Sequence, residues 1–492
     1  MRQLFTNACF HSLRTPDEQF SAVLCEDGII IEIFQGQPEI AGVEVIDLQG
    51  AHVYPGFTDT HTHSFEGGLY NMAGELNCVS SISDVLEVLA ETKPIGGIIF
   101  ASNLDEQQLK EQRFPTRTEL DSVCPDKLLL LRRIDGHSSV VNSVAAKQLR
   151  EHFGTDFSGV LKYKLNGKAI RWFHRHIDEE GVVSAYRRAS EIALKAGLTC
   201  VHTMIGDADS DLLHYNLIKE NLHNFPVRFE LYPQVLDIDK ALETGSTRIG
   251  GCILADGSFG SHTAALKQPY TDKSALHPSP YHSDNFWQKF VEKAHINDLQ
   301  VFVHAIGDAA IEQIIGAYTH ANRKYPKNIR HGIIHCELLS PEMIEAMANE
   351  NIVAVTQPMF DSLWGGREGM YARLLGVERA ARTNSLGSFT RAGVTVTGGS
   401  DWYITELNPL AGIYAAMNIH NPEERLSVYE ALSLYTRNVA LLENNSQTRG
   451  TIEPTKIADF TCTDREIAET GQQAIVITTI REGKIVWEAS PD

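Results

Sequence analysis

Two histidines, His61 and His63, stand two residues apart in the segment PGFTDTHTH. On an extended chain, residues at positions i and i+2 point to the same face, so both imidazoles can reach one cation. The spacing alone also fits two ordinary surface histidines. What decides between these interpretations is whether other metal-binding side chains fall in equivalent places along the chain.

Further side chains of this kind each lie near the end of an apolar, strand-like segment. They are Cys252, His304, His335 and Asp401. In a closed barrel of parallel strands, the carboxyl ends of the strands meet at one face, where barrel active sites lie. Imidazole and carboxylate groups suit zinc or a similar divalent ion. Together with His61 and His63, these side chains predict a metal centre, and we call the whole set the six-residue cluster.

The strands that would position this cluster alternate with helical segments through the middle of the chain. Helix starts are marked there by signals such as Ser340-Pro341, an N-cap residue followed by proline at the first helical position. The apolar runs number eight, which is what a closed parallel barrel needs. They are residues 53–60, 198–204, 227–233, 248–254, 300–306, 332–338, 352–358 and 394–401. The pattern predicts an α/β fold, a (β/α)8 TIM barrel.

Both ends of the chain are rich in β-strand patterns. Residues 20–33 read as a hairpin around Asp27-Gly28, a favoured pair for a two-residue turn, and residues 474–489 read as a second hairpin. Residues 66–190 are too many for a loop between a strand and a helix, so we expect an insertion between the first two barrel strands, packed over the top of the barrel. The expected domains are a β-sandwich from residues 1–54 and 441–492, and a barrel from residues 55–440.

Composition narrows the function classes. Apolar residues make up 43% and charged residues 22% of the 492 residues, as in globular proteins, and the formal charge of −20 argues against nucleic acid or an anionic membrane as the main partner. No run of about 18 apolar residues and no signal-peptide pattern is present, which predicts a cytoplasmic protein without membrane contact. The eight cysteines are scattered without a C-x-x-C pair, so a disulfide framework or zinc knuckle is not expected.

Several stretches carry a family resemblance. They are PGFTDTHTH (55–63), RIDGHSSVVNS (133–143), ILADGSFGSHTAAL (253–266), VHAIGDAAIE (303–312), IIHCELL (333–339), TGGSDW (397–402) and GTIEPTKIADF (450–460). The chain resembles the amidohydrolase superfamily, in particular the amidohydrolase family 3 branch of YtcJ-like proteins and N-substituted formamide deformylases. The resemblance implies that the metal ligands are His61, His63, His304, His335 and Asp401.

Cys252 marks a departure from the family pattern. The branch usually reads K-x-x-x-D-G, whereas this chain has Cys252-Ile253-Leu254-Ala255-Asp256-Gly257. A lysine carbamate bridging two metals is therefore excluded. The superfamily's D-aminoacylase-like enzymes are similar in using cysteine as a ligand, and thiolate binds zinc well. The competing interpretation is that Cys252 is a small buried core residue.

Three more residues are candidates on the substrate side. His137 resembles the branch's substrate-side histidine in the insertion. His202 ends the second barrel strand and could bind substrate or donate a hydrogen bond to a metal ligand. Asp256 could orient a ligand or cap the turn before Gly257. We therefore predict substrate contacts for His137, His202 and Asp256, with these alternatives open.

The resemblance implies hydrolysis of a non-peptide C–N bond in a small molecule, and we expect a linear amide such as an N-acyl or N-formyl amine. One or two divalent ions, expected to be zinc, would activate water, with Asp401 acting as general base and then general acid. Barrels of this type often pair, so a homodimer is expected.

Three alternatives to this function stay open. The same ligands could serve a hydrolase of a cyclic amide, an ester or an amidine. A non-catalytic scaffold of the same fold would normally have lost ligands, whereas this chain keeps them. A barrel aldolase or isomerase would need a Schiff-base lysine or an acid/base pair at the strand ends, and no such lysine stands there.

Overall fold

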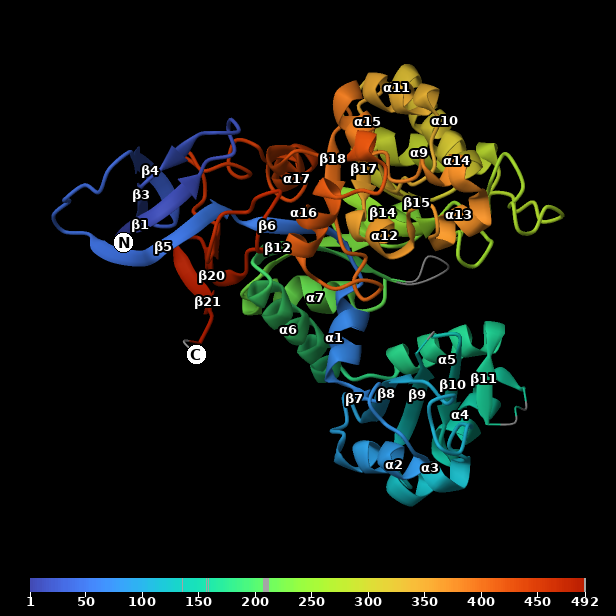
Figure 1. Cartoon of the computed structure of the whole chain (residues 1–492). Helices are drawn as coiled ribbons and strands as arrows, with labels where there is room; N and C mark the ends of the chain where they lie inside the picture. The colour runs from blue at the N-terminus through green and yellow to red at the C-terminus, as the bar shows by residue number, and fades with distance from the viewer. Residues whose placement is uncertain (135, 156, 158, 207–211, 491–492) are drawn as a thin grey trace. The chain divides into compact units, whose positions relative to one another are not determined.

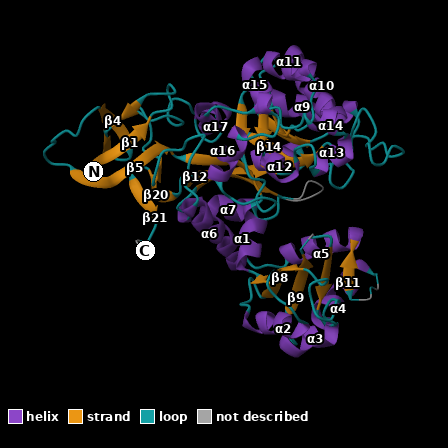
Figure 2. Ribbon diagram, viewed as in Figure 1, coloured by secondary structure: helices purple, strands orange, loops and turns teal. Residues whose placement is uncertain are grey.

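The computed structural model resolves the chain into two compact units (Figures 1 and 2). The first comprises Met1–His63 and Ser190–Asp492, and the second comprises Ser64–Ala189. The structure describes residues 1–134, 136–155, 157, 159–206 and 212–490.

A barrel of parallel strands forms the larger part of the first unit. A 3-stranded sheet, in the order β13-β12-β6, and a 5-stranded sheet, in the order β14-β15-β16-β17-β18, pair in parallel throughout their described residues. Strand β13 contacts β14, and a parallel bridge between Thr62 and Trp402 joins β6 to the segment after β18. The strands are β6 (Phe57–Thr62), β12 (Leu198–Ile205), β13 (Arg228–Pro233), β14 (Arg248–Leu254), β15 (Gln300–Ala305), β16 (Gly332–His335), β17 (Val353–Thr356) and β18 (Val396–Gly398).

This arrangement confirms the predicted barrel, and each predicted strand overlaps an observed one. The bounds of the first strand are wrong, however. Residues 53–55 end a long strand of another sheet, and β6 begins only at Phe57. The apolar run continues through both strands because Val53 and Phe57 are each buried, so periodicity alone could not show the break at Gly56.

Helices surround the barrel strands in Figure 2. As predicted, one begins at Pro341 behind Ser340, whose side chain accepts a hydrogen bond from the Met343 amide. The helices of the first unit are α7 (Tyr215–Asn221), α8 (Ile238–Glu243), α9 (Asp284–Ile296), α10 (Asp308–Lys324), α11 (Pro341–Asn349), α12 (Pro358–Trp364), α13 (Met370–Leu375), α14 (Val377–Ala380), α15 (Leu386–Ala392), α16 (Pro409–Met417), α17 (Val428–Ser433) and α18 (Arg437–Leu442), and α6 (Glu179–Lys195) spans the boundary between the two units.

An 8-stranded sheet, which we call the terminal sheet, contains strands from both ends of the chain. Its order is β21-β20-β19-β5-β1-β3-β4, with β2 paired to β1. Asp27 and Gly28 both have positive φ at the predicted first turn, as a two-residue hairpin requires. The rings of Phe5 and Phe10 pack edge-on against Phe460 in the core beneath it. The strands are β1 (Arg2–His11), β2 (Gln19–Phe20), β3 (Ala22–Glu26), β4 (Ile29–Phe34), β5 (Glu44–Pro55), β19 (Phe460–Thr463), β20 (Val476–Arg481) and β21 (Lys484–Glu488).

The second unit has a 5-stranded sheet of its own, in the order β11-β10-β9-β8-β7, and a separate apolar core. Asp135, in the predicted motif 133–143, lies outside the described residues. The elements are α1 (Ser64–Met72), β7 (Gly74–Glu75), α2 (Ile82–Glu91), β8 (Ile98–Leu104), α3 (Arg117–Val123), β9 (Leu128–Arg133), β10 (Ser138–Val141), α4 (Ser143–Phe153), β11 (Val160–Lys162) and α5 (Tyr163–Arg175).

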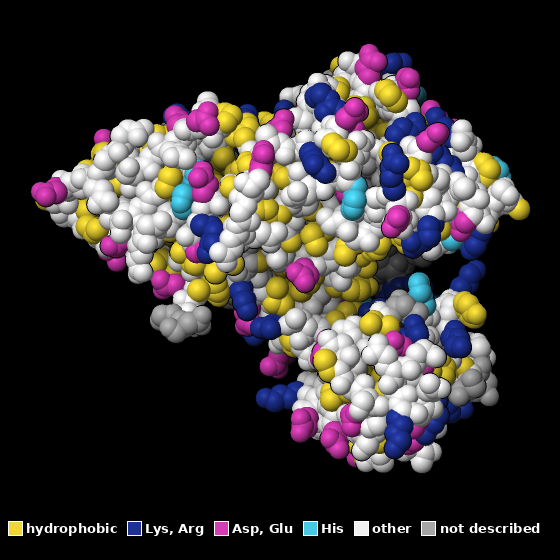
Figure 3. Space-filling view, in the orientation of Figure 1, with side chains coloured by type: hydrophobic (Ala, Val, Ile, Leu, Met, Phe, Trp, Pro, Cys, Tyr) yellow, Lys and Arg dark blue, Asp and Glu magenta, His cyan; other side chains and the backbone are white. Residues whose placement is uncertain are grey.

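The surface fits the mixed composition of the sequence. On the face drawn in Figure 3, acidic and basic side chains are interspersed. Among the described residues, no helix combines the length and the apolar character needed to cross a bilayer.

Candidate metal centre

The ends of β6 and β18 are joined by backbone hydrogen bonds that bring His61 and His63 next to Asp401. The Asp401 amide donates to the His61 carbonyl at 2.9 Å, and the His63 amide donates to the Trp402 carbonyl at 2.6 Å. Asp401 Oδ1 consequently lies 3.2 Å from His61 Nε2 and 3.3 Å from His63 Nε2. Asp401 itself adopts a left-handed backbone conformation, with φ of 54°, which aims its carboxylate at the two rings.

Asp59 is a residue that the sequence reasoning missed. Its Oδ1 accepts a hydrogen bond from the His61 amide at 3.0 Å, and its Oδ2 accepts one from the Ser400 amide at 3.0 Å. Burial raises the pKa of this carboxyl to about 6, against the opposing effect of these hydrogen bonds. The signal was available in the sequence, because Asp59 stands two residues before His61 on the same face of the strand.

Cys252 lies in an irregular part of β14, where the pairing with β15 is interrupted. Gly250 and Gly251 both have positive φ, of 103° and 94°, and the register between β14 and β15 shifts between Gly250 and Ile253. A Cβ atom at Gly250 would lie 2.1 Å from the Phe302 carbonyl oxygen, so this conformation requires glycine. The bulge sets the direction of Cys252, whose sulfur comes within 4.8 Å of ligand atoms of His61 and His63.

His304 and His335 complete the cluster from β15 and β16. Their ring centroids lie 4.5 Å apart, and the ring centroids of His335 and His61 lie 5.5 Å apart. Phe360 stacks on the His335 ring, with ring centroids 5.7 Å apart. His335 has a left-handed φ of 69°, so it and Asp401 are both held in a sparsely populated conformation. The structure thus brings together all six members of the cluster.

Asp256 anchors the loops around His304. Its carboxylate accepts hydrogen bonds from the backbone amides of Ala265 at 2.8 Å, Ile306 at 3.0 Å and Gly307 at 2.8 Å. The side chain is fully buried. Its described contacts are therefore those of a residue that fixes the loop after β14 against the end of β15.

The cluster is electrostatically coupled. Burial opposes ionisation of the Cys252 thiol, but hydrogen bonds with His304 and His63 outweigh it and lower the pKa to about 6. The same thiol, overcoming the effect of burial, raises the pKa of His304 to about 9. Burial likewise disfavours the Asp401 carboxylate, yet its interactions with the His61 and His63 rings hold its pKa well below the usual range. The thiol and the carboxyl thus both favour their anionic forms, which are the forms that bind metal.

The partners of the buried ring nitrogens indicate whether the cluster can hold a cation. His61 Nδ1, His304 Nδ1 and His335 Nδ1 are buried without a hydrogen-bond partner, and the buried His61 Nε2 faces the Asp401 carboxylate at 3.2 Å. Leaving a buried polar atom unsatisfied costs about 1–3 kcal/mol, so such atoms normally mark an ion or a water. Imidazole nitrogens beside a thiol and a carboxylate are the donor set of a zinc-type ion, so the residues present fit a divalent cation.

Glu337 is a second residue that the sequence reasoning missed. It is 2% exposed, and its Oε2 has no hydrogen-bond partner. Burial is the main reason that the pKa of this carboxyl rises to about 7, and its electrostatic neighbours include His304 and Asp401. Glu337 follows His335 by two residues, but a lone glutamate in the segment HCELL gives no pattern that would predict its burial.

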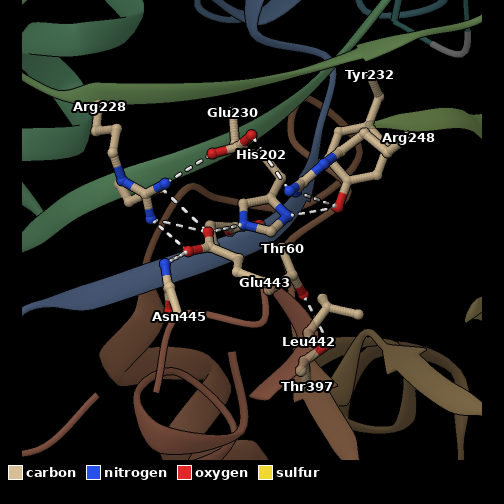
Figure 4. Close-up of polar contacts among 12 residues, drawn as sticks. Thr60, His202, Arg228, Glu230, Tyr232, Arg248, Thr397, Leu442, Glu443 and Asn445 are labelled. Atoms are coloured by element: carbon tan, nitrogen blue, oxygen red, sulfur yellow. Dashed lines mark hydrogen bonds and ion pairs between the residues drawn. The ribbon is translucent and has the colours of Figure 1, made fainter. Parts of the chain in front are cut away.

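His202 belongs to a different group of polar residues, drawn in Figure 4. Its ring is fully buried, Nδ1 lies 2.8 Å from the Tyr232 hydroxyl, and Nε2 lies 2.7 Å from Glu443 Oε1. Arg228, the first residue of β13, donates to the same Glu443 carboxylate at 2.7 Å. Both ring nitrogens of His202 are thus engaged in a buried network that ties the barrel interior to the segment after α18, and the structure does not bring His202 into the cluster.

His137 lies in the second unit, directly before β10, and its side chain is exposed. With Lys162 and Asn166 it lines a cavity of that unit. These contacts all lie within the second unit, so contact between His137 and a substrate stays a prediction.

With this geometry in place, comparison with known proteins identifies the family. Residues 44–487 match the family described as "Amidohydrolase family". The chain belongs to the amidohydrolase family. The match confirms the resemblance seen in the motifs, and it makes this protein a metal-dependent hydrolase of the amidohydrolase superfamily.

Individual relatives agree with this assignment. The chain is 28% identical to the protein YtcJ of Bacillus subtilis (strain 168), covering 100% of both chains. It is 24% identical to an N-substituted formamide deformylase of Arthrobacter pascens, covering 97% of each. Among solved structures, an uncharacterized metal-dependent hydrolase from Pyrococcus furiosus shares the amidohydrolase fold with a TM-score of 0.82 at 23% identity, covering 95% of this chain and 99% of that one.

Proposed function

We propose that the six-residue cluster holds one or two zinc ions and that this amidohydrolase hydrolyses a linear amide, an N-acyl or N-formyl amine. The observation that carries the proposal is the convergence of the cluster from five barrel strand ends, with buried imidazole nitrogens that lack hydrogen-bond partners. The proposed metal ligands are His61, His63, Cys252, His304, His335 and Asp401.

The number of ions follows from how the ligands group. His61, His63 and Cys252 offer ligand atoms within 4.8 Å of one another, and so do His61, His335 and Asp401. His61 is common to both groups, which supports either a single ion or two neighbouring ions. Nitrogen and sulfur donors favour zinc over magnesium or calcium, which prefer oxygen.

The proposed chemistry assigns the proton transfers to Asp401. A bound divalent ion would supply an acidified water and polarise the amide carbonyl. The Asp401 carboxylate, held anionic beside His61 and His63, accepts the proton of the attacking water and then delivers it to the leaving nitrogen. Asp59 and Asp256 hold the strand ends in place, because each accepts hydrogen bonds from backbone amides that flank a proposed ligand. Substrate contacts by His137, His202 and Asp256 stay predictions, and the described bonds of His202 and Asp256 favour positioning roles.

The substrate class is supported by the similarity to an N-substituted formamide deformylase. Hydrolysis of a cyclic amide, an ester or an amidine would use the same metal ligands. A non-catalytic scaffold of the same fold would not need these ligands. We would therefore screen the zinc-loaded protein against N-formyl amines, N-acyl amines, lactams, esters and amidines. Turnover confined to the linear amides would support the proposal, turnover of another class would replace the substrate assignment, and no turnover would favour the scaffold.

The remaining expectations belong to the same proposal. We propose that residues 1–54 and 441–492 make a β-sandwich domain around a barrel at 55–440, supported by the terminal sheet that joins both ends of the chain.

All eight cysteines are unpaired, which supports a reducing, cytoplasmic location. A homodimer stays a prediction, and sedimentation of the purified protein would test it.

A further inference from the structure

Three side chains with metal-binding atoms meet on the terminal sheet, outside the barrel. Cys9 and His11 lie on β1, two residues apart and therefore on one face of the strand. His52 lies on the neighbouring β5, directly opposite Cys9 in the parallel register. The Cys9 sulfur and one nitrogen from each ring all lie within 4.8 Å of one another. Adjacent strands thus offer one thiol and two imidazoles to a single point.

The two rings face each other through their nitrogens. His11 Nε2 and His52 Nδ1 are 3.0 Å apart, and the ring planes are inclined by only 26°. In a tetrahedral zinc site with Zn–N bonds of about 2.0–2.1 Å, two ligand nitrogens lie about 3.4 Å apart. An ion between these atoms therefore requires a small adjustment of the rings and no change in the strands.

The surroundings hold His11 in the orientation that a ligand needs. Tyr54 stacks on its ring, with centroids 4.5 Å apart and planes inclined by 9°. The Tyr54 hydroxyl is itself fixed by a hydrogen bond from the Ile467 amide at 2.9 Å. Gln19 Nε2 lies 3.5 Å from His11 Nδ1, the ring nitrogen that is not turned to His52. A polar contact at the outer ring nitrogen helps to orient a histidine that binds metal through its other nitrogen.

We propose that Cys9, His11 and His52 form a second divalent-metal site, of zinc type, that clamps β1 to β5 in the terminal sheet. The thiolate and two neutral imidazoles supply three of four tetrahedral positions, and Glu466 or a water supplies the fourth. Glu466 is already an electrostatic neighbour of Cys9. A site with its ligands on two paired strands serves structure, because the ion binds the folded sheet and not the unfolded chain.

The test compares zinc bound per chain by elemental analysis of the full-length protein. The proteins are the wild type, Cys9→Ser, His52→Gln and, as a control, Cys78→Ser, which changes an exposed cysteine of the second unit. We expect Cys9→Ser and His52→Gln each to bind one ion fewer than the wild type and to keep amide hydrolysis, and Cys78→Ser to bind as many as the wild type. Equal zinc content in all four proteins would overturn the proposal.

Cobalt spectroscopy separates this site from the barrel cluster, which also contains a cysteine. In a Cys252→Ser background loaded with Co²⁺, a thiolate-to-cobalt absorption band should persist and should vanish on adding Cys9→Ser. A band that is absent in Cys252→Ser alone, or that survives in the double variant, would refute the site. Because the readout is an absorption band, it does not depend on catalytic activity.

Discussion

The carboxylate of Asp59 accepts a hydrogen bond from the amide of Ser400 at 3.0 Å, across the seam where β6 meets β18. The same carboxylate accepts one from the His61 amide. One buried side chain thus sets the distance between two segments that carry proposed metal ligands. A Cβ atom at Gly399 would lie only 2.8 Å from the His61 nitrogen, which shows how closely the two segments approach.

Asp59→Asn should weaken the metal centre without removing it. The amide group keeps one acceptor oxygen but places an NH2 group against a backbone amide, so His61 and Asp401 lose their relative position. Loss of such an outer partner typically costs about 10–100-fold in metal affinity or activity. The measurement is zinc affinity together with kcat/KM. Asp47→Asn, at an exposed position, is the control, and an Asp59 variant that matched it in both quantities would refute the positioning role.

Cys252→Ser should lower zinc occupancy while leaving the melting temperature of the metal-free protein almost unchanged. If the sulfur binds metal, the hydroxyl is a poorer ligand of similar volume. The matched control is Cys462→Ser, a fully buried cysteine of the terminal sheet core, where a hydroxyl without a partner should lower stability and leave zinc binding intact. Should Cys252→Ser behave like this control, Cys252 is a core residue and the cluster has five ligands.

Particular residues show which features of the fold and of the cluster could be predicted from the sequence. The barrel strands were predictable because each is an apolar run with helical segments between, and His61, His304, His335 and Asp401 were predictable because they end such runs. The direction of Cys252 was not, since it depends on a bulge at Gly250 and Gly251. His202 was placed at a strand end by sequence, yet its partner Glu443 lies 241 residues further along the chain, and no local pattern relates positions so distant.

Glu443→Gln should destabilise the fold and leave zinc binding unchanged. The carboxylate of Glu443 is buried and bonded to both Arg228 and His202, and removing one partner of a buried ion pair costs about 3–5 kcal/mol. Chemical denaturation would measure the loss. Asp239→Asn, which breaks an exposed pair with Lys293, should cost less than about 1 kcal/mol. A raised KM in Glu443→Gln at unchanged stability would instead place His202 at the substrate.

We expect the free energy of unfolding to fall in acid, in part because of the buried ring of His331. This ring is buried, its Nε2 lies 2.9 Å from His295 Nδ1, its Nδ1 accepts a hydrogen bond from the Val301 amide, and Tyr318 stacks on it. Burial, with a smaller contribution from His295, lowers the pKa of His331 to about 3. Between about pH 6.5 and 3 the unfolded chain therefore binds the proton that the folded ring refuses, and the free energy of unfolding falls as the pH falls, by about 1.4 kcal/mol per pH unit for this group.

Denaturation of the wild type and of His331→Gln across this pH range isolates the contribution. Carboxylates titrate equally in both proteins, so the wild type should show the steeper loss of stability. His223→Gln, at an exposed site, should keep the wild-type slope. Identical slopes for all three proteins would show that His331 is protonated without cost in the folded state.

We infer that the six-residue cluster at the barrel strand ends holds the ion required for hydrolysis. The most direct test is elemental analysis of the wild type and of the double variant His61→Ala/His63→Ala, purified and zinc-loaded side by side. We expect the wild type to bind at least one ion more per chain than the double variant, because His61 is shared by both ligand groups. Equal metal content in two folded proteins would contradict it.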